Sequence, residues 1–185
     1  MDLARPQRST IVLAHHGTSA SVASHILGEG FRSSKNEYDW LGDGTYFWEN
    51  NFSRAEAWAV QHHEDPVVIE AQIDLEDCLD LTNPKWFALL TRYADRILSA
   101  RKSAGLKPLR QEGLFHGKDR FIINKIADEL EASGRPLRSV RGAFSEGDPA
   151  YPGSALFSQS HVQIAVRDPA VIQSVAVTRV RSVFP

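Results

Sequence analysis

The chain has 185 residues, of which 42% are hydrophobic and 24% are charged, and its formal net charge is −2. These values fit a one-domain soluble protein, exclude disordered and fibrous classes, and give no whole-molecule attraction to nucleic acid or membrane. The single cysteine, Cys78, excludes an internal disulfide and favours a reducing compartment. Carboxylates flank it, so we expect a small core residue with a raised thiol pKa.

The first ten residues are polar, which predicts no signal peptide, and no run of about eighteen apolar residues predicts a membrane span. We therefore expect a cytoplasmic protein without a membrane partner, and a monomer. The histidines occur as adjacent pairs without the spacing of metal ligands, so no metal site is expected.

Hydrophobic spacing and capping signals predict the elements in chain order. These are a strand at Thr10–His15, a helix at Ser19–Leu27, an extended stretch at Phe31–Asn36, a strand at Thr45–Trp48, a helix at Ser53–His62, a strand at Val67–Leu75, helices at Pro84–Ala104 and Asp119–Ala132, and strands at Val140–Phe144, His161–Val166 and Val171–Val180. Ser53 and Glu56 form a capping box, which makes Ser53 the expected N-cap. The order lacks regular strand–helix alternation and predicts a single α+β domain with antiparallel sheets and a helical insertion at about 83–135.

Charge is uneven along the chain. Between Arg92 and Arg141 there are 12 Lys/Arg against 6 Asp/Glu, a local net charge of +6, so the remainder carries −8. Two readings stay open: a solvated face on two helices, or a surface for a phosphate-rich partner such as RNA or DNA. No aromatic interleaving supports a base-stacking platform there.

Three features are candidates for chemistry. His15-His16-Gly17-Thr18 ends the first predicted strand, where a ring nitrogen and bare backbone face a cleft. Gly42-Asp43-Gly44 precedes the aromatic run Tyr46-Phe47-Trp48, which predicts a sharp turn followed by a presented ring. The long Glu146–Ser154 loop leads into a strand whose alternation puts His161 and Gln163 on one face.

Together and in this order, these features resemble the ADP-ribosyltransferase superfamily, in the branch shared by diphtheria toxin and the poly(ADP-ribose) polymerases. The resemblance rests on His16-Gly17-Thr18 and Gly44-Thr45-Tyr46-Phe47, with a looser match at Ser53, Arg54 and Trp58 and at the segment 26–34. It covers about fifty residues near the N-terminus, plus a weaker match near Gln163.

The resemblance implies split antiparallel sheets around a cleft that binds NAD+ as a substrate. It implies that His16 binds the adenosine ribose and that the Gly17 backbone holds the nicotinamide carboxamide, with Thr18 and Ser53 in the same binding site. Tyr46 would stack on the nicotinamide ring, and Trp58 is the candidate for its other face. Clamping the ring would favour departure of neutral nicotinamide.

The third family position departs from the pattern. Where family members place a glutamate, this chain has Gln163, which lacks the negative charge that stabilises an oxocarbenium-like transition state and cannot act as a general base. Elongation to a polymer is therefore not expected. Glu146 in the loop and Glu49 near Tyr46 are the alternative sources of a carboxylate.

Three functions follow as hypotheses. The first is a mono-ADP-ribosyltransferase acting on nucleic acid or protein, as a toxin or defence effector with an antitoxin or immunity protein as an open partner. The second is an NAD+ glycohydrolase, in which water replaces the acceptor. The third is a non-catalytic domain that binds NAD+ or ADP-ribose, which Gln163 keeps open.

Overall fold

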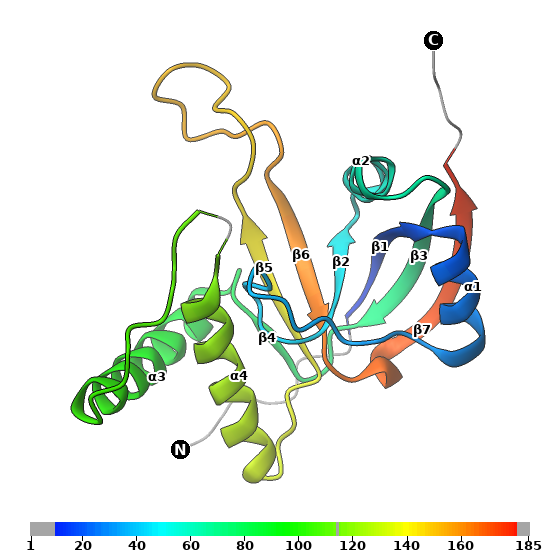
Figure 1. Cartoon of the computed structure of the whole chain (residues 1–185). Helices are drawn as coiled ribbons and strands as arrows, with labels where there is room; N and C mark the ends of the chain where they lie inside the picture. Colours follow the sequence, from blue (N-terminus) through cyan, green and yellow to red (C-terminus); the bar gives the residue numbers. More distant parts are fainter. Residues whose placement is uncertain (1–9, 114, 181–185) are drawn as a thin grey trace.

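The structure, a computed structural model, describes residues 10–113 and 115–180 (Figure 1). The polar first nine residues, on which the absence of a signal peptide was predicted, lie outside the described range. The elements are β1 (Ile11–Ser19), α1 (Ala20–Glu29), β2 (Thr45–Glu49), α2 (Phe52–His62), β3 (Pro66–Asp74), β4 (Cys78–Asp80), α3 (Pro84–Ser103), α4 (Gly117–Ala132), β5 (Ser139–Phe144), β6 (His161–Val166), the 3-10 helix η1 (Pro169–Val171) and β7 (Ile172–Arg179).

The seven strands form one hydrogen-bonded sheet in the order β4-β5-β6-β2-β1-β3-β7. The fold is α+β, as predicted, but the sheet is mixed, because β4 pairs with β5 in parallel while the other neighbours are antiparallel. The prediction missed β4. It has only three residues, too few to show an alternating pattern.

The predicted split into two sheets is only partly realised. β1 and β2 pair at two positions, Ala14 with Glu49 and His15 with Trp48, and then diverge. Beyond that point the ring of His16 lies against the next strand, with its Nδ1 2.8 Å from the Tyr46 carbonyl oxygen. A side chain thus takes the hydrogen bond that a ladder would have made, so the sheet opens locally without separating.

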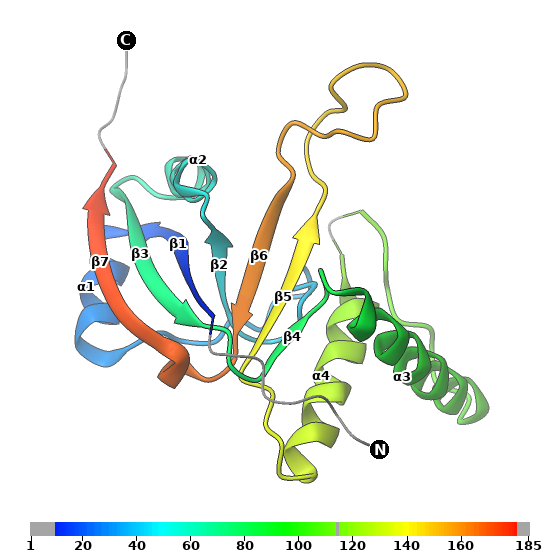
Figure 2. The ribbon, with the colours of Figure 1, turned by 180° about the vertical axis from the view of Figure 1, so that it is seen from behind.

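The helices divide between the two halves of the sheet. α1 and α2 lie beside β1 and β3, while α3 and α4 lie beside β4 and β5 (Figures 1 and 2). In the first half Ala23 of α1 packs on Val67 and Ile69 of β3. In the second half Ile123 of α4 packs on Val140 of β5. The predicted helical segment between the halves therefore forms α3 and α4.

The N-caps of α1 and α2 are both short polar residues, and the predicted cap of α2, Ser53, is wrong. Ser19 caps α1, its Oγ accepting a hydrogen bond from the Val22 N–H at 3.2 Å. For α2 the cap is Asn51, whose Oδ1 accepts from the Arg54 N–H at 3.0 Å, so Ser53 lies inside the first turn. Both sites offer a short polar side chain, and the tertiary position of the helix start decides between them.

Two further predictions concern membrane spans and the single cysteine. No helix in residues 10–113 and 115–180 is long and apolar enough to cross a membrane. Cys78 is a buried core residue, as predicted, and burial is the main reason that its thiol pKa rises to about 12. The neighbouring carboxylate of Asp80 adds a smaller increase to this pKa.

Gly17 supplies a first test of this packing. An added Cβ would lie 2.2 Å from the carbonyl oxygen of Ala55 in α2. We expect Gly17→Ala to lower the free energy of unfolding by about 3 kcal/mol or to prevent folding, since backbone on both sides resists adjustment. The measurement is urea unfolding followed by tryptophan fluorescence. Gly28→Ala is the matched control: a Cβ there meets nothing within 4 Å in α1, so this variant should be neutral or more stable.

Candidate active site

A cavity of about 710 Å³ brings most of the predicted site residues together. Those that line it are His16, Gly17, Tyr46, Trp58, Gln163 and the alternative carboxylate Glu146. They come from β1, β2, α2, β6 and the loop after β5, so residues up to 147 positions apart, from 16 to 163, meet at one place. This size suits a small organic ligand or cofactor.

His16 is held in one tautomer. Its Nδ1 faces the carbonyl oxygen of Tyr46 at 2.8 Å, and because a carbonyl only accepts, Nδ1 must carry the proton. The rings of Phe31 and Phe47 flank the imidazole at centroid distances of 5.7 and 5.5 Å. Burial lowers the pKa of His16, which favours the neutral ring. Its Nε2 is therefore an acceptor, suited to a ligand hydroxyl.

The backbone N–H and C=O of Gly17 face the side of β1 on which β2 has separated from it. The Leu13 carbonyl accepts from Asn50 on the β2 side, whereas the Thr10 carbonyl accepts from Leu75 on the β3 side. Because backbone direction alternates along a strand, Gly17 faces the same side as Leu13. At Gly17 β2 has already diverged. One N–H and one C=O thus face the cavity side together.

Tyr46 presents its ring and uses its hydroxyl for structure. The hydroxyl donates to the Gly42 carbonyl at 2.9 Å and accepts from the Leu41 N–H at 2.9 Å. Burial, more than any neighbouring charge, raises the pKa of this phenol. The Tyr46 hydroxyl is thus hydrogen-bonded to the predicted turn that precedes β2.

Trp58 lies at the cavity with one face already covered. Its ring stacks on His62, one turn along α2, at a centroid distance of 4.3 Å and an interplanar angle of 20°. Both residues line the cavity. Only the other face or the edge of Trp58 is therefore open to a ligand.

Gln163 is oriented by Trp40, which was not among the residues selected from the sequence. The Trp40 indole N–H donates to Oε1 of Gln163 at 2.6 Å. Because an indole nitrogen only donates, this contact fixes the amide orientation. Trp40 also packs against the strand beside β6, where a Cβ on Gly142 would lie 2.6 Å from its ring. The glutamine is thus held in place but brings no charge.

Glu146 is a carboxylate of this cavity, and Glu49 is not. Glu146 is 37% exposed and pairs with the Arg54 guanidinium at 2.5 Å, with His161 Nδ1 3.9 Å away. Glu49 lies on the face of β2 opposite Tyr46 and makes two hydrogen bonds to Arg141. Glu146 therefore lies in the cavity lining, whereas the Glu49 side chain lies outside it.

Two other predicted binding residues do not line the cavity. Thr18 is 4% exposed at the buried end of β1, and Ser53 lies in the first turn of α2. Both residues were selected because each lies next to a motif residue. The neighbouring residues Gly17 and Arg54 line the cavity, whereas Thr18 and Ser53 do not. Thr18 and Ser53 therefore lie outside the cavity lining, and a binding role for them stays a prediction.

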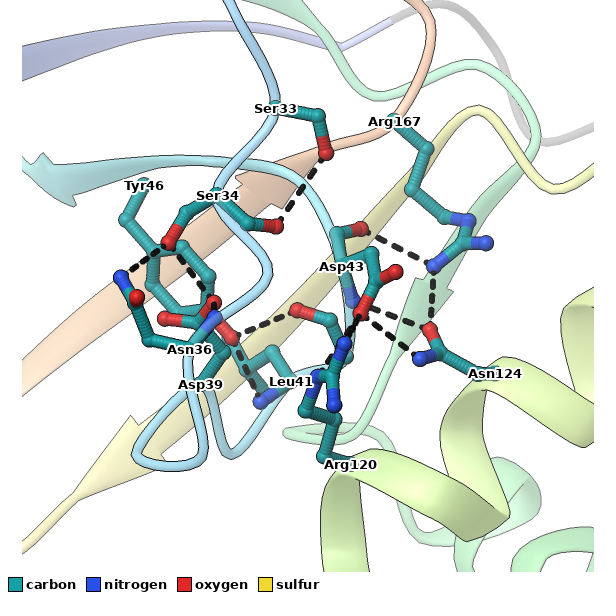
Figure 3. A network of polar contacts seen from close by, with 11 residues as sticks. Ser33, Ser34, Asn36, Asp39, Leu41, Asp43, Tyr46, Arg120, Asn124 and Arg167 are labelled. Carbon is teal, nitrogen blue, oxygen red and sulfur yellow. Dashed lines mark hydrogen bonds and ion pairs between the residues drawn. The ribbon is translucent and has the colours of Figure 1, made fainter. Parts of the chain in front are cut away.

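The wall opposite β2 is a loop held by two buried or partly buried aspartates (Figure 3). Asp39 accepts from the Ser34 hydroxyl at 2.7 Å and from the Asn36 N–H at 2.6 Å. Burial raises the pKa of Asp39, and these two hydrogen bonds oppose that rise. Asp43 binds Arg120 and Asn124 of α4, each at 2.8 Å. The loop is thus bonded to itself and to the helical half of the protein.

Several cavity residues were not selected from the sequence for a role. Arg32, Asp39, Trp40, His116 and Phe144 also line it. Arg54 had been noted only as part of a loose motif match. The signal that finds Arg54 is its position four residues before Trp58 in α2, which places both on one helix face.

Comparison with protein-family models gives no match, and comparison with curated proteins gives none either. Within the described residues, no group of three or more His, Cys, Asp or Glu side chains is arranged to hold a metal ion.

The Tyr46 hydroxyl and ring can be tested separately. Tyr46→Phe leaves the Leu41 N–H and the Gly42 carbonyl without their partner, so we expect a loss of about 1–3 kcal/mol in the free energy of unfolding. Ligand affinity should change little, because the ring stays. Tyr46→Ala should lose both. Urea unfolding and equilibrium binding of NAD+ measure the two effects, and equal loss of affinity in both variants would contradict the assigned roles.

Two histidines with a lowered pKa, His16 and His161, predict an acid-sensitive fold. Burial lowers the pKa of His16 and of His161, so below about 6.5 the unfolded chain takes up protons that the folded chain does not. The free energy of unfolding should therefore fall as pH drops below that value. Urea unfolding across a pH series checks this. His161→Asn should flatten the dependence, because it removes one of the two groups whose pKa is lowered.

Proposed function

We propose that the protein is an NAD+-dependent ADP-ribosyltransferase that transfers ADP-ribose to a macromolecular acceptor. The observation that carries this proposal is the convergence of His16, Gly17 and Tyr46 on one cavity of about 710 Å³. Their chemistry matches the parts of NAD+ that they would meet: a ribose hydroxyl, a carboxamide and a flat cationic ring.

The Gly17 backbone suits the nicotinamide carboxamide. That group needs one acceptor for its NH₂ and one donor for its carbonyl oxygen, and a single residue facing the cavity side supplies both. Tyr46 offers a fixed aromatic face for the positively charged pyridinium ring, with Trp58 available on another side. His16 Nε2 can accept from a ribose hydroxyl.

The cavity also carries positive charge for the pyrophosphate. Arg32 and Arg54 both line it. Arg32 is 77% exposed and pairs with Glu29 at the surface, whereas the Arg54 guanidinium is 16% exposed and its Nε lacks a hydrogen-bond partner within the described residues. Arg54 is therefore the better placed cation, since a half-buried guanidinium binds an anion more strongly than a solvated one.

In the proposed reaction the bond between C1′ of the nicotinamide ribose and the pyridinium nitrogen breaks. Its electron pair neutralises the nicotinamide, and positive charge develops on the ribose ring. An acceptor nucleophile then bonds to C1′ and loses a proton. Negative charge near the ribose lowers the barrier to this step. Gln163 provides none, and Glu146 is a carboxylate in the lining of the same cavity.

The first experiment is incubation of the pure protein with radiolabelled NAD+ and three acceptor pools: cell protein, total RNA and single-stranded DNA. Label on one pool supports the transferase and identifies its substrate class. Nicotinamide release without label indicates a glycohydrolase. NAD+ binding without turnover indicates a binding domain, the outcome favoured by the uncharged Gln163. Unchanged binding and turnover in both His16→Ala and Tyr46→Ala would contradict the site itself.

The carboxylate can be assigned with one matched pair of variants. Glu146→Gln keeps a hydrogen bond to Arg54 but removes the charge, so we expect kcat to fall by about 100-fold with little change in NAD+ affinity. Glu131→Gln, at an exposed residue of α4 away from the cavity lining, is the control and should be silent. Full activity of Glu146→Gln would show that this charge is not used. Gln163→Glu would then be expected to raise turnover.

A further inference from the structure

A second cavity of about 460 Å³ lies beside the first, between α4, the segment before it and the loop before β2. Its lining includes Arg110, Phe115, Arg120, Phe121, Asn124 and Arg167. None of the residues assigned to NAD+ lies in it. Arginines, aromatic rings and an amide together form the set of groups that binds single-stranded nucleic acid.

The charges of this cavity do not cancel fully. Asp43 pairs with Arg120 at 2.8 Å, and Asp128 pairs with Lys125 at 2.9 Å. Arg167 instead donates to two neutral oxygens, the Asp43 carbonyl and Asn124 Oδ1, both at 2.9 Å, and so keeps its charge in a fixed orientation (Figure 3).

Apart from these two ion pairs, the cavity lining contains two cationic side chains and one acidic side chain. Arg110 and Arg167 face only Glu37 among the acidic residues of the lining that are not ion-paired within the described chain. The surplus charge of the cavity lining is thus positive.

Arginine and aromatic rings are stacked here, which the sequence pattern did not reveal. The Arg110 guanidinium lies over the Phe115 ring at 3.3 Å from its centroid, and Arg101 lies over Phe121 at 4.7 Å. A guanidinium spread on a ring gives a flat cationic surface against which a base can stack while a phosphate is held at its edge.

The two cavities share a wall one residue thick. Phe115 and Gly117 line the second cavity, whereas His116 between them lines the first. Opposite them Glu37 lines the second cavity and Tyr38 lines the first. The wall is joined by one backbone hydrogen bond, from the His116 N–H to the Glu37 carbonyl at 2.9 Å. The two linings therefore meet at residues 37–38 and 115–117.

We propose that the second cavity docks a single-stranded nucleic acid and that this strand is the ADP-ribose acceptor. The inference rests on the proposed transferase function. Arg110 and Arg167 hold phosphates, the Arg110–Phe115 stack holds a base, and the next nucleotide crosses the 37–116 wall. There its nucleophilic nitrogen or oxygen bonds to C1′ as nicotinamide leaves with the electron pair, and its proton passes to solvent.

The test measures binding without NAD+, so that it stands apart from turnover. Fluorescently labelled single-stranded DNA and RNA of about 12 nucleotides are titrated with the full chain at several salt concentrations, with duplex DNA as a comparison. The variant is Arg110→Ala with Arg167→Gln, which removes two charges from the lining of the second cavity. The control, Arg92→Ala with Arg135→Ala, removes the same charge from residues that are exposed and line neither cavity.

We expect the wild type and the control to bind single strands more tightly than duplex. The cavity variant should lower the slope of log affinity against log salt by about 1.4, the value for two single-strand phosphate contacts. It should also lose labelling of the oligonucleotide while nicotinamide release without acceptor stays the same. DNA and RNA arms identify which strand is preferred.

Three outcomes would overturn the inference. They are absence of oligonucleotide binding, equal losses in the cavity and control variants, and labelling that goes to cell protein instead. Oligonucleotide binding that follows the cavity variant in a protein without NAD+ turnover would support the docking site while the transferase function itself failed.

Discussion

The contact between the His16 ring and the Tyr46 carbonyl is the constraint on which the site depends. A continuous ladder between β1 and β2 would consume the backbone groups of Gly17 and leave no cavity between the strands. By placing an imidazole where the next ladder bond would form, the chain satisfies one carbonyl and keeps the strands apart. The same bond sets the tautomer of His16. One interaction thus opens the sheet, frees a donor and an acceptor, and orients a third polar group.

The loop before β2 makes this opening stable. A segment without regular structure must satisfy its own backbone groups, and here Asp39 and the Tyr46 hydroxyl do so from inside. Asp43 then bonds the loop to α4 through Arg120 and Asn124. Because both cavities take part of their lining from residues 37–43, their relative position is set by the same hydrogen bonds. A shift of α4 would therefore displace the loop that holds the Tyr46 hydroxyl.

Elements with a periodic hydrophobic pattern and short local motifs could be predicted from the sequence. Strands and helices with a clear period, and the gathering of His16, Tyr46 and Gln163, could be read from pattern and resemblance. Residues that owe their place to tertiary packing could not. Trp40 meets Gln163 across 123 positions, and Arg54 meets Glu146 across 92. The same reason explains why Ser53 and Thr18 lie outside the cavity lining, since a motif neighbour in sequence shares a strand or turn but not necessarily a face.

The uncharged Gln163 changes how charge must be supplied if NAD+ is the substrate. Arg54 is the half-buried cation best placed for the pyrophosphate, and in the structure it is bound to Glu146. A pyrophosphate would compete with Glu146 for that guanidinium. It offers two phosphate groups as acceptors, whereas Glu146 offers one carboxylate. Binding would therefore weaken the hold on Glu146 as substrate arrives, leaving its charge available to the ribose. The carboxylate would then be most effective in the loaded site, and in the empty protein it would serve to neutralise a buried arginine.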